Sequence, residues 1–127
     1  MPSLRGASPY LLAGLLAGAG ATHFLAPAFY DRMVPEVLPG PSRAWTYGSG
    51  LAEVAVAVAL VPERTRRRGA LAAAALFLGV FPGNLKMALD AETGTEQLLT
   101  CARLPLQIPL VAWAWRVFRQ ARTPAPQ

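Results

Sequence analysis

Four long apolar runs constrain most strongly what this chain can fold into. They cover residues 10–26, 45–61, 69–89 and 104–118, and the charged residues inside them are Glu53, Lys86 and Arg116. A hydrocarbon core about 30 Å thick is crossed by roughly 17–25 helical residues, so each run, with its flanks, is long enough to span a membrane. The runs are apolar on all sides and do not alternate, which excludes membrane β-strands. We therefore predict an all-α, integral membrane, antiparallel four-helix bundle that forms one domain over residues 1–127.

The charges are distributed unevenly between the segments that connect these runs. The net charge is +5, and charged residues make up only 15% of the chain, against roughly 25% in soluble proteins. One side has four cations against five acids, whereas the other has eight cations against the single acid Glu63. Those eight are Arg5, Arg64, Arg66, Arg67, Arg68, Arg116, Arg119 and Arg122. The positive-inside rule then predicts both termini in the cytoplasm, and the basic charge sets orientation instead of binding nucleic acid.

The first run also has an alternative interpretation. Arg5, the apolar residues and Ala26-Pro27-Ala28 could form a cleavable signal peptide, but the proline in the cleavage site argues against it. In the same run, Gly14-x-x-x-Gly18 places small residues at four-residue spacing, which favours close packing within the chain over a dimer contact. The lone Cys101 allows no intramolecular disulfide.

Strongly polar residues inside membrane spans are energetically expensive, so each calls for a partner and a reason. Five of them fall toward the outer side and are the candidate ligand-binding residues: His23, Glu53, Asn84, Arg103 and Gln107. We expect Glu53 to pair with Arg103, whose long side chain can reach inward, with Lys86 and His23 as the alternatives. The pair could fix helix register or could serve a ligand or proton, and the residues alone leave both roles open.

The segment between the first two runs, residues 27–44, is too apolar for a solvated linker. Phe29, Tyr30 and Met33 recur at near-helical spacing, so we expect a short helix at the membrane surface that covers the polar pocket as a lid. Phe81-Pro82-Gly83 should break the third helix just before Asn84, because Pro82 has no N–H to donate to Leu78. One histidine is too few for a multi-histidine metal site, so no metal is expected.

Four motifs together resemble the DoxX-like family of small four-helix membrane proteins. They read His23-Phe-x-x-Pro-x-x-Tyr-x-x-Met-Val-Pro-x-x-Leu-Pro39, Tyr47-x-Ser-Gly-x-x-Glu53, Val80-Phe-Pro-x-Asn84 and Arg103-Leu-Pro-Leu-Gln107. The resemblance implies a multi-pass protein of a bacterial inner membrane. It also implies an association with quinone-linked sulfur oxidation or with membrane oxidoreductase complexes, but it assigns no catalytic residue.

These observations lead to three expectations about function. The first is a non-catalytic subunit, or a component that binds a quinone-like small molecule, in a membrane redox system, because apolar walls with a few polar anchors suit such a ligand. The second is a membrane enzyme that uses Glu53 as an acid or base. The third is a structural membrane partner with no ligand. The expected partners are the lipid bilayer and membrane oxidoreductase proteins, and nucleic acid is not among them.

Overall fold

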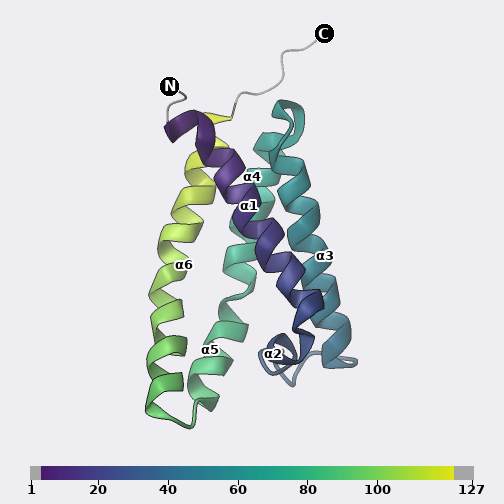
Figure 1. Ribbon diagram of the computed structural model, residues 1–127, viewed down its shortest axis with the longest axis vertical. Coiled ribbons are helices and arrows are strands. Elements are labelled where there is room, and N and C mark those ends of the chain that lie inside the picture. Colours follow the sequence, from purple (N-terminus) through teal and green to yellow (C-terminus); the bar gives the residue numbers. More distant parts are fainter. Residues whose placement is uncertain (1–3, 122–127) are drawn as a thin grey trace.

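The computed structural model describes residues 4–121, with side chains from Gly6 onward, and this part of the chain is helical with no strand (Figure 1). The helices are α1 (Leu4–Leu25), α2 (Pro27–Asp31), α3 (Ser42–Leu60), α4 (Glu63–Gly79), α5 (Phe81–Asp90) and α6 (Gly94–Gln120). The start of α1, the α3–α4 turn and the end of α6 lie together at what we call the turn end (Figure 1). The helix α2 and the α5–α6 turn lie at the opposite end, the α2 end (Figure 1).

The long helices pack in pairs: α1 against α3, α3 against α4, and both α4 and α5 against α6. The core is built mostly from alanine and leucine, with Leu12, Leu16 and Leu60 fully buried. Small residues such as Ala70 and Ala73, which are completely buried, let α4 approach its neighbours closely. The predicted all-α fold is confirmed.

Two stretches, Glu63–Asp90 and Gly94–Gln120, are long and apolar enough to cross a membrane. In the most apolar 18-residue stretch of each, only 22% and 17% are buried inside the protein, so most of this apolar surface faces outward. In the core helix of a soluble protein most of it would be covered. The helices α1 and α3 are not among the stretches that are long and apolar enough. Thr22 and His23 lower the mean hydropathy of α1, and Arg43 and Glu53 lower that of α3.

Helix ends differ from the apolar runs used to predict them. The last helix begins at Gly94, ten residues before the predicted 104, because Thr93 caps it. The Glu96 backbone N–H donates to the Thr93 hydroxyl (3.1 Å), and the Glu96 carboxylate accepts from the Glu92 backbone N–H (3.1 Å). The first helix begins at Leu4 and includes Pro9. Apolar runs mark hydropathy, whereas side-chain caps mark where a helix starts.

The predicted break in the third run is confirmed. The helix α4 ends at Gly79 and α5 begins at Phe81, with Pro82 in the first turn of α5, where its missing N–H is tolerated. The fourth run behaves differently, because α6 continues through both Pro105 and Pro109.

The close approach of α1 and α3 depends on Gly20 and Gly50. A Cβ at Gly20 would lie 2.8 Å from the Gly50 carbonyl oxygen, and a Cβ at Gly50 would lie 3.1 Å from the Gly20 carbonyl oxygen. A Cβ at Gly14 or Gly18 would meet nothing within 4 Å. The expectation that Gly14 and Gly18 pack within the chain is therefore wrong: they lie on another face of α1, and Gly20 makes the contact.

Arginines at the start of α4 hold the turn end together. Arg66 donates to the carbonyl oxygens of Leu60 (2.9 Å) and Val61 (2.7 Å), which caps the end of α3. Its guanidinium lies 5.1 Å from the centre of the Tyr10 ring on α1, and that of Arg67 lies 4.1 Å from the Phe118 ring on α6. The side chain of Arg5 and the whole of Arg122, both used in the charge argument, lie outside the described residues.

Candidate functional site

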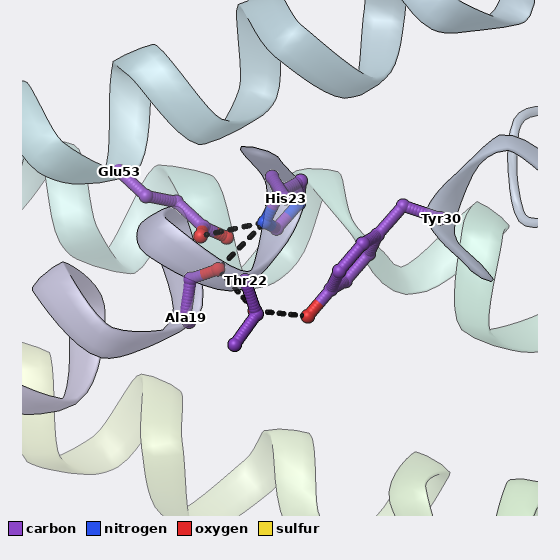
Figure 2. Close-up of polar contacts among 5 residues, drawn as sticks. All are labelled: Ala19, Thr22, His23, Tyr30 and Glu53. Atoms are coloured by element: carbon purple, nitrogen blue, oxygen red, sulfur yellow. Dashed lines mark hydrogen bonds and ion pairs between the residues drawn. The ribbon is translucent and has the colours of Figure 1, made fainter. Parts of the chain in front are cut away.

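The polar centre of the α2 end is a buried pair formed by His23 of α1 and Glu53 of α3 (Figure 2). The two residues are 7% and 8% exposed, and His23 Nδ1 lies 3.5 Å from Glu53 Oε2. Gly50 lies on α3 one helical turn before Glu53, and its missing side chain leaves room for the Cβ of His23. The glycine contact between α1 and α3 therefore brings the imidazole and the carboxylate together.

A short chain of hydrogen bonds surrounds the imidazole and places a hydrogen on its Nδ1 (Figure 2). The Ala19 carbonyl oxygen lies 2.7 Å from His23 Nδ1, and a carbonyl can only accept, so Nδ1 carries a hydrogen. The Thr22 hydroxyl donates to the same carbonyl at 2.6 Å, so the Tyr30 hydroxyl donates to Thr22 Oγ1 at 2.5 Å. In the neutral imidazole Nε2 is then an acceptor, and it has no hydrogen-bond partner among the described residues.

Glu53 Oε2 is buried and accepts no hydrogen bond from the described residues. Buried carboxylates in folded proteins are normally paired and hydrogen-bonded, so such an oxygen calls for an explanation. The preferred partner Arg103 is wrong, and one of the two alternatives, His23, is the residue that pairs with Glu53. Lys86, the other cation considered, pairs instead with Asp90 at 3.0 Å.

The helix α2 covers this pair. The Tyr30 ring stacks on the imidazole of His23 with 3.7 Å between ring centres, and Phe29 meets Tyr30 edge-on at 5.2 Å. The segment after α2 packs on α5, where a Cβ at Gly83 would lie 3.1 Å from the Met33 carbonyl oxygen. Tyr30 thus lies where a lid residue was expected, whereas Phe29 and Met33 contact other parts of the α2 end.

Arg103 belongs to a separate open cavity of about 270 Å³ between α2, α5 and α6. The cavity is lined by Phe29, Arg32, Met87, Asp90, Ala91, Glu96, Leu99, Thr100 and Arg103. The Arg103 guanidinium lies 5.3 Å from the centre of the Phe29 ring and donates to Met87 Sδ at 3.6 Å. His23 and Glu53 do not line this cavity, so the one pocket expected from the sequence is divided between two places.

The remaining two candidates lie apart from both places. Gln107 is buried on α6 and donates to the carbonyl oxygen of Phe77, near the α4–α5 break, while its Oε1 accepts no hydrogen bond from the described residues. Asn84 is half-buried in the first turn of α5, where its backbone N–H donates to Val80. Gln107 satisfies a carbonyl near a proline break, which is a structural role. The sequence reasoning missed Thr22, Arg32 and Glu96, although Thr93-x-x-Glu96 is a recognisable capping signal.

A family model described as a domain of unknown function, DUF8561, matches residues 12–118. The chain belongs to the DUF8561 family. The matched range includes the His23–Glu53 pair, the helix α2 and the cavity around Arg103, so all of these features lie within the DUF8561 domain. No curated protein and no solved structure matches the chain.

Asp31 joins α2 to α3 in the DUF8561 domain. Its carboxylate accepts from the Thr46 hydroxyl at 2.6 Å and from Arg43 Nε at 2.9 Å. The hydrogen bond from Thr46 has the largest effect and lowers the pKa of Asp31; desolvation comes next and opposes it, and the hydrogen bond and charge of Arg43 lower the pKa further. Because Tyr30 is the residue before Asp31, these contacts also hold the cover over His23.

Acidification should weaken this attachment of α2. A carboxyl group whose pKa is lower in the folded state stabilises the fold above its unfolded pKa, and that stabilisation is lost as the pH falls through the folded pKa. We expect the difference in thermal unfolding midpoint between the wild type and Asp31→Asn to be largest near neutral pH and to shrink on acidification. Circular dichroism in detergent at a series of pH values measures it, and a difference that stays constant down to strong acid would contradict the role given to Asp31.

Proposed function

We propose that this chain is a multi-pass protein of a bacterial inner membrane, with α1, α3, α4–α5 and α6 as four crossings and both termini in the cytoplasm. Large apolar side chains that are exposed on every crossing support this placement, since soluble proteins rarely leave so many of them uncovered along every helix. Examples are Leu11 (57% exposed), Leu51 (65%), Leu78 (62%) and Ile108 (73%). The arginines of the α3–α4 turn make the turn end the cytoplasmic one by the positive-inside rule.

Cysteine labelling in whole cells tests this orientation. In a Cys101→Ser background, Glu92→Cys places one thiol at the α5–α6 turn and Arg64→Cys places one at the α3–α4 turn; both positions are exposed. A membrane-impermeant maleimide should label Glu92→Cys in intact spheroplasts and Arg64→Cys only after the membrane is permeabilised. Recovery of the chain in the soluble fraction, or the opposite labelling pattern, would refute the placement.

We further infer that the His23–Glu53 pair is the polar anchor for a small amphipathic ligand of the quinone class. The observation that carries this proposal is the buried Glu53 Oε2 without a hydrogen bond, beside an imidazole whose Nε2 has no partner among the described residues. The hydroxyl of the reduced, quinol form would donate to the carboxylate, whereas a carbonyl oxygen of the oxidised form can only accept and would take a hydrogen bond from the imidazole when Nε2 carries a hydrogen. Together with the DoxX-like motifs, this supports a non-catalytic binding subunit of a membrane redox system.

Co-purification tests the ligand proposal. The intact chain, purified in mild detergent, should carry one small molecule per chain that mass spectrometry of the extract identifies. Glu53→Gln removes the charge with little change of shape, and we expect retention to fall about tenfold, since a hydrogen bond to a charged group is lost. Glu63→Gln, which neutralises an exposed acid at the start of α4, is the matched control and should retain the ligand.

Two results would replace this proposal. An extract with no bound molecule, from a chain that Glu53→Gln leaves unchanged, would favour a structural membrane partner. Turnover of a substrate by the isolated chain that is lost in Glu53→Gln would favour a membrane enzyme. That alternative rests on a buried carboxylate beside an imidazole, with an oxygen that accepts no hydrogen bond from the described residues.

A further inference from the structure

The cavity between α2, α5 and α6 contains two guanidinium groups without an acidic partner. Arg32 and Arg103 lie 6.0 Å and 5.3 Å from the centre of the same Phe29 ring. Neither makes an ion pair with a carboxylate among the described residues. Guanidinium groups bind phosphate through paired, charge-assisted hydrogen bonds, so two of them at one cavity favour a phosphate group.

The same cavity has two carboxylates with unused acceptor capacity. One oxygen of Asp90 pairs with Lys86, and one oxygen of Glu96 accepts from the Glu92 backbone N–H. The second oxygen of each carboxylate accepts no hydrogen bond from the described residues. The lining thus contains both signs of charge, which suits a group that carries a cation next to its anion and not a simple anion.

The size and surroundings of the cavity limit the ligand further. A volume of about 270 Å³ is small beside the roughly 300–1,000 Å³ of pockets for drug-sized ligands. Exposed leucines lie on both sides of the α5–α6 turn: Leu89 is 77% exposed and Leu98 71%. A small polar head would fit the cavity, and long apolar chains would lie along these leucines outside it.

We propose that this cavity binds the head group of a zwitterionic phospholipid that has a phosphate and a primary ammonium. Arg32 and Arg103 hold the phosphate, and Asp90 and Glu96 accept hydrogen bonds from the ammonium. The α5–α6 turn then lies at the level of the lipid head groups on the outer surface. This inference rests on the membrane placement proposed above, but not on a ligand at His23–Glu53.

Native mass spectrometry of the detergent-purified chain tests the proposal with three lipids of matched acyl chains. Phosphatidylethanolamine should bind about tenfold more tightly than phosphatidylglycerol, which lacks the ammonium, or phosphatidylcholine, whose quaternary ammonium has no N–H to donate. Equal binding of the three lipids would overturn the proposal. Free phosphoethanolamine is a competitor in a further arm. If it binds as tightly as the whole lipid, the site belongs to a soluble ligand and the lipid assignment is wrong.

Variants separate the two halves of the head group. Arg32→Gln and Arg103→Gln should weaken the binding of all three lipids about tenfold. Glu96→Gln, whose side chain can still accept from the Glu92 backbone N–H, should remove only the preference for phosphatidylethanolamine.

Arg68→Gln neutralises an exposed arginine at the turn end and is the control for these variants. Arg32 is itself exposed, so its variant should fold. Unchanged binding in Arg32→Gln and Arg103→Gln would refute the site. Glu53→Gln should bind the lipid normally, which keeps this test separate from that of the quinone-class ligand.

Discussion

Replacing Gly20 or Gly50 by alanine should lower the free energy of unfolding by roughly 1–3 kcal/mol, the usual range for overpacking. A Cβ at Gly20 would lie 2.7 Å from Val54 Cγ2 and 2.8 Å from the Gly50 carbonyl oxygen. A Cβ at Gly50 would lie 2.7 Å from the Cβ of His23. Backbone and Cβ atoms cannot turn away as the end of a long side chain can, so α1 and α3 must separate. Unfolding in mixed detergent micelles, followed by circular dichroism, measures the loss.

Gly18→Ala is the matched control for this prediction. Gly18 lies on the same helix, but an added Cβ there meets nothing within 4 Å. Alanine is favoured over glycine inside a helix by about 0.5–1 kcal/mol, so this variant should be slightly more stable than the wild type. Equal losses at Gly18 and Gly20 would show that the contact between α1 and α3 has been assigned to the wrong face. Separation of the two helices should also move His23 away from Glu53.

The helices were largely predictable from the sequence, because hydropathy alone separates four apolar runs and Pro82 marks the break between α4 and α5. The start of α6 was not found in this way. Its first turns contain the charged residues Glu96 and Arg103, so a search for uncharged runs begins only after them, although Thr93 and Glu96 are a capping signal.

The candidate site was predictable in part: two of its members, His23 and Glu53, follow from the sequence, but its arrangement does not. Depth along a helix follows from residue number, so Glu53 and His23 were correctly placed toward the same end. Which way each side chain points depends on how the helices rotate and tilt, and residue number does not determine that. Arg103 therefore has a plausible depth for pairing with Glu53 but lies at the cavity beside Phe29. The contact between Gly20 and Gly50, which decides the partner of Glu53, gives no distinctive signal in a chain with 11 glycines.

Glu53→Met should leave the fold as stable as the wild type or make it more stable, by up to about 3 kcal/mol, the desolvation penalty of a buried polar group that makes no hydrogen bond. Glu53 Oε2 accepts no hydrogen bond, so its removal leaves no donor among the described residues without a partner. His23 keeps its bond to the Ala19 carbonyl oxygen and can be neutral. The same variant should lose the co-purifying small molecule. A residue that binds a ligand at the expense of the stability of the fold is typical of a functional site.

If Glu53→Met instead lowers the free energy of unfolding, Glu53 has a structural role. If the charged pair fixes the register of α1 and α3, removing one partner leaves a buried charge and should cost about 3–5 kcal/mol. The His23→Leu, Glu53→Met double variant distinguishes the two cases. Should the pair hold the helices together, replacing both residues recovers much of the loss caused by either alone, because no buried charge remains. If Glu53 is instead kept for a ligand, the single Glu53→Met change causes no loss to recover. The free energies of unfolding of the two single variants and the double variant, measured in the same detergent, therefore decide between a register-fixing pair and a binding site.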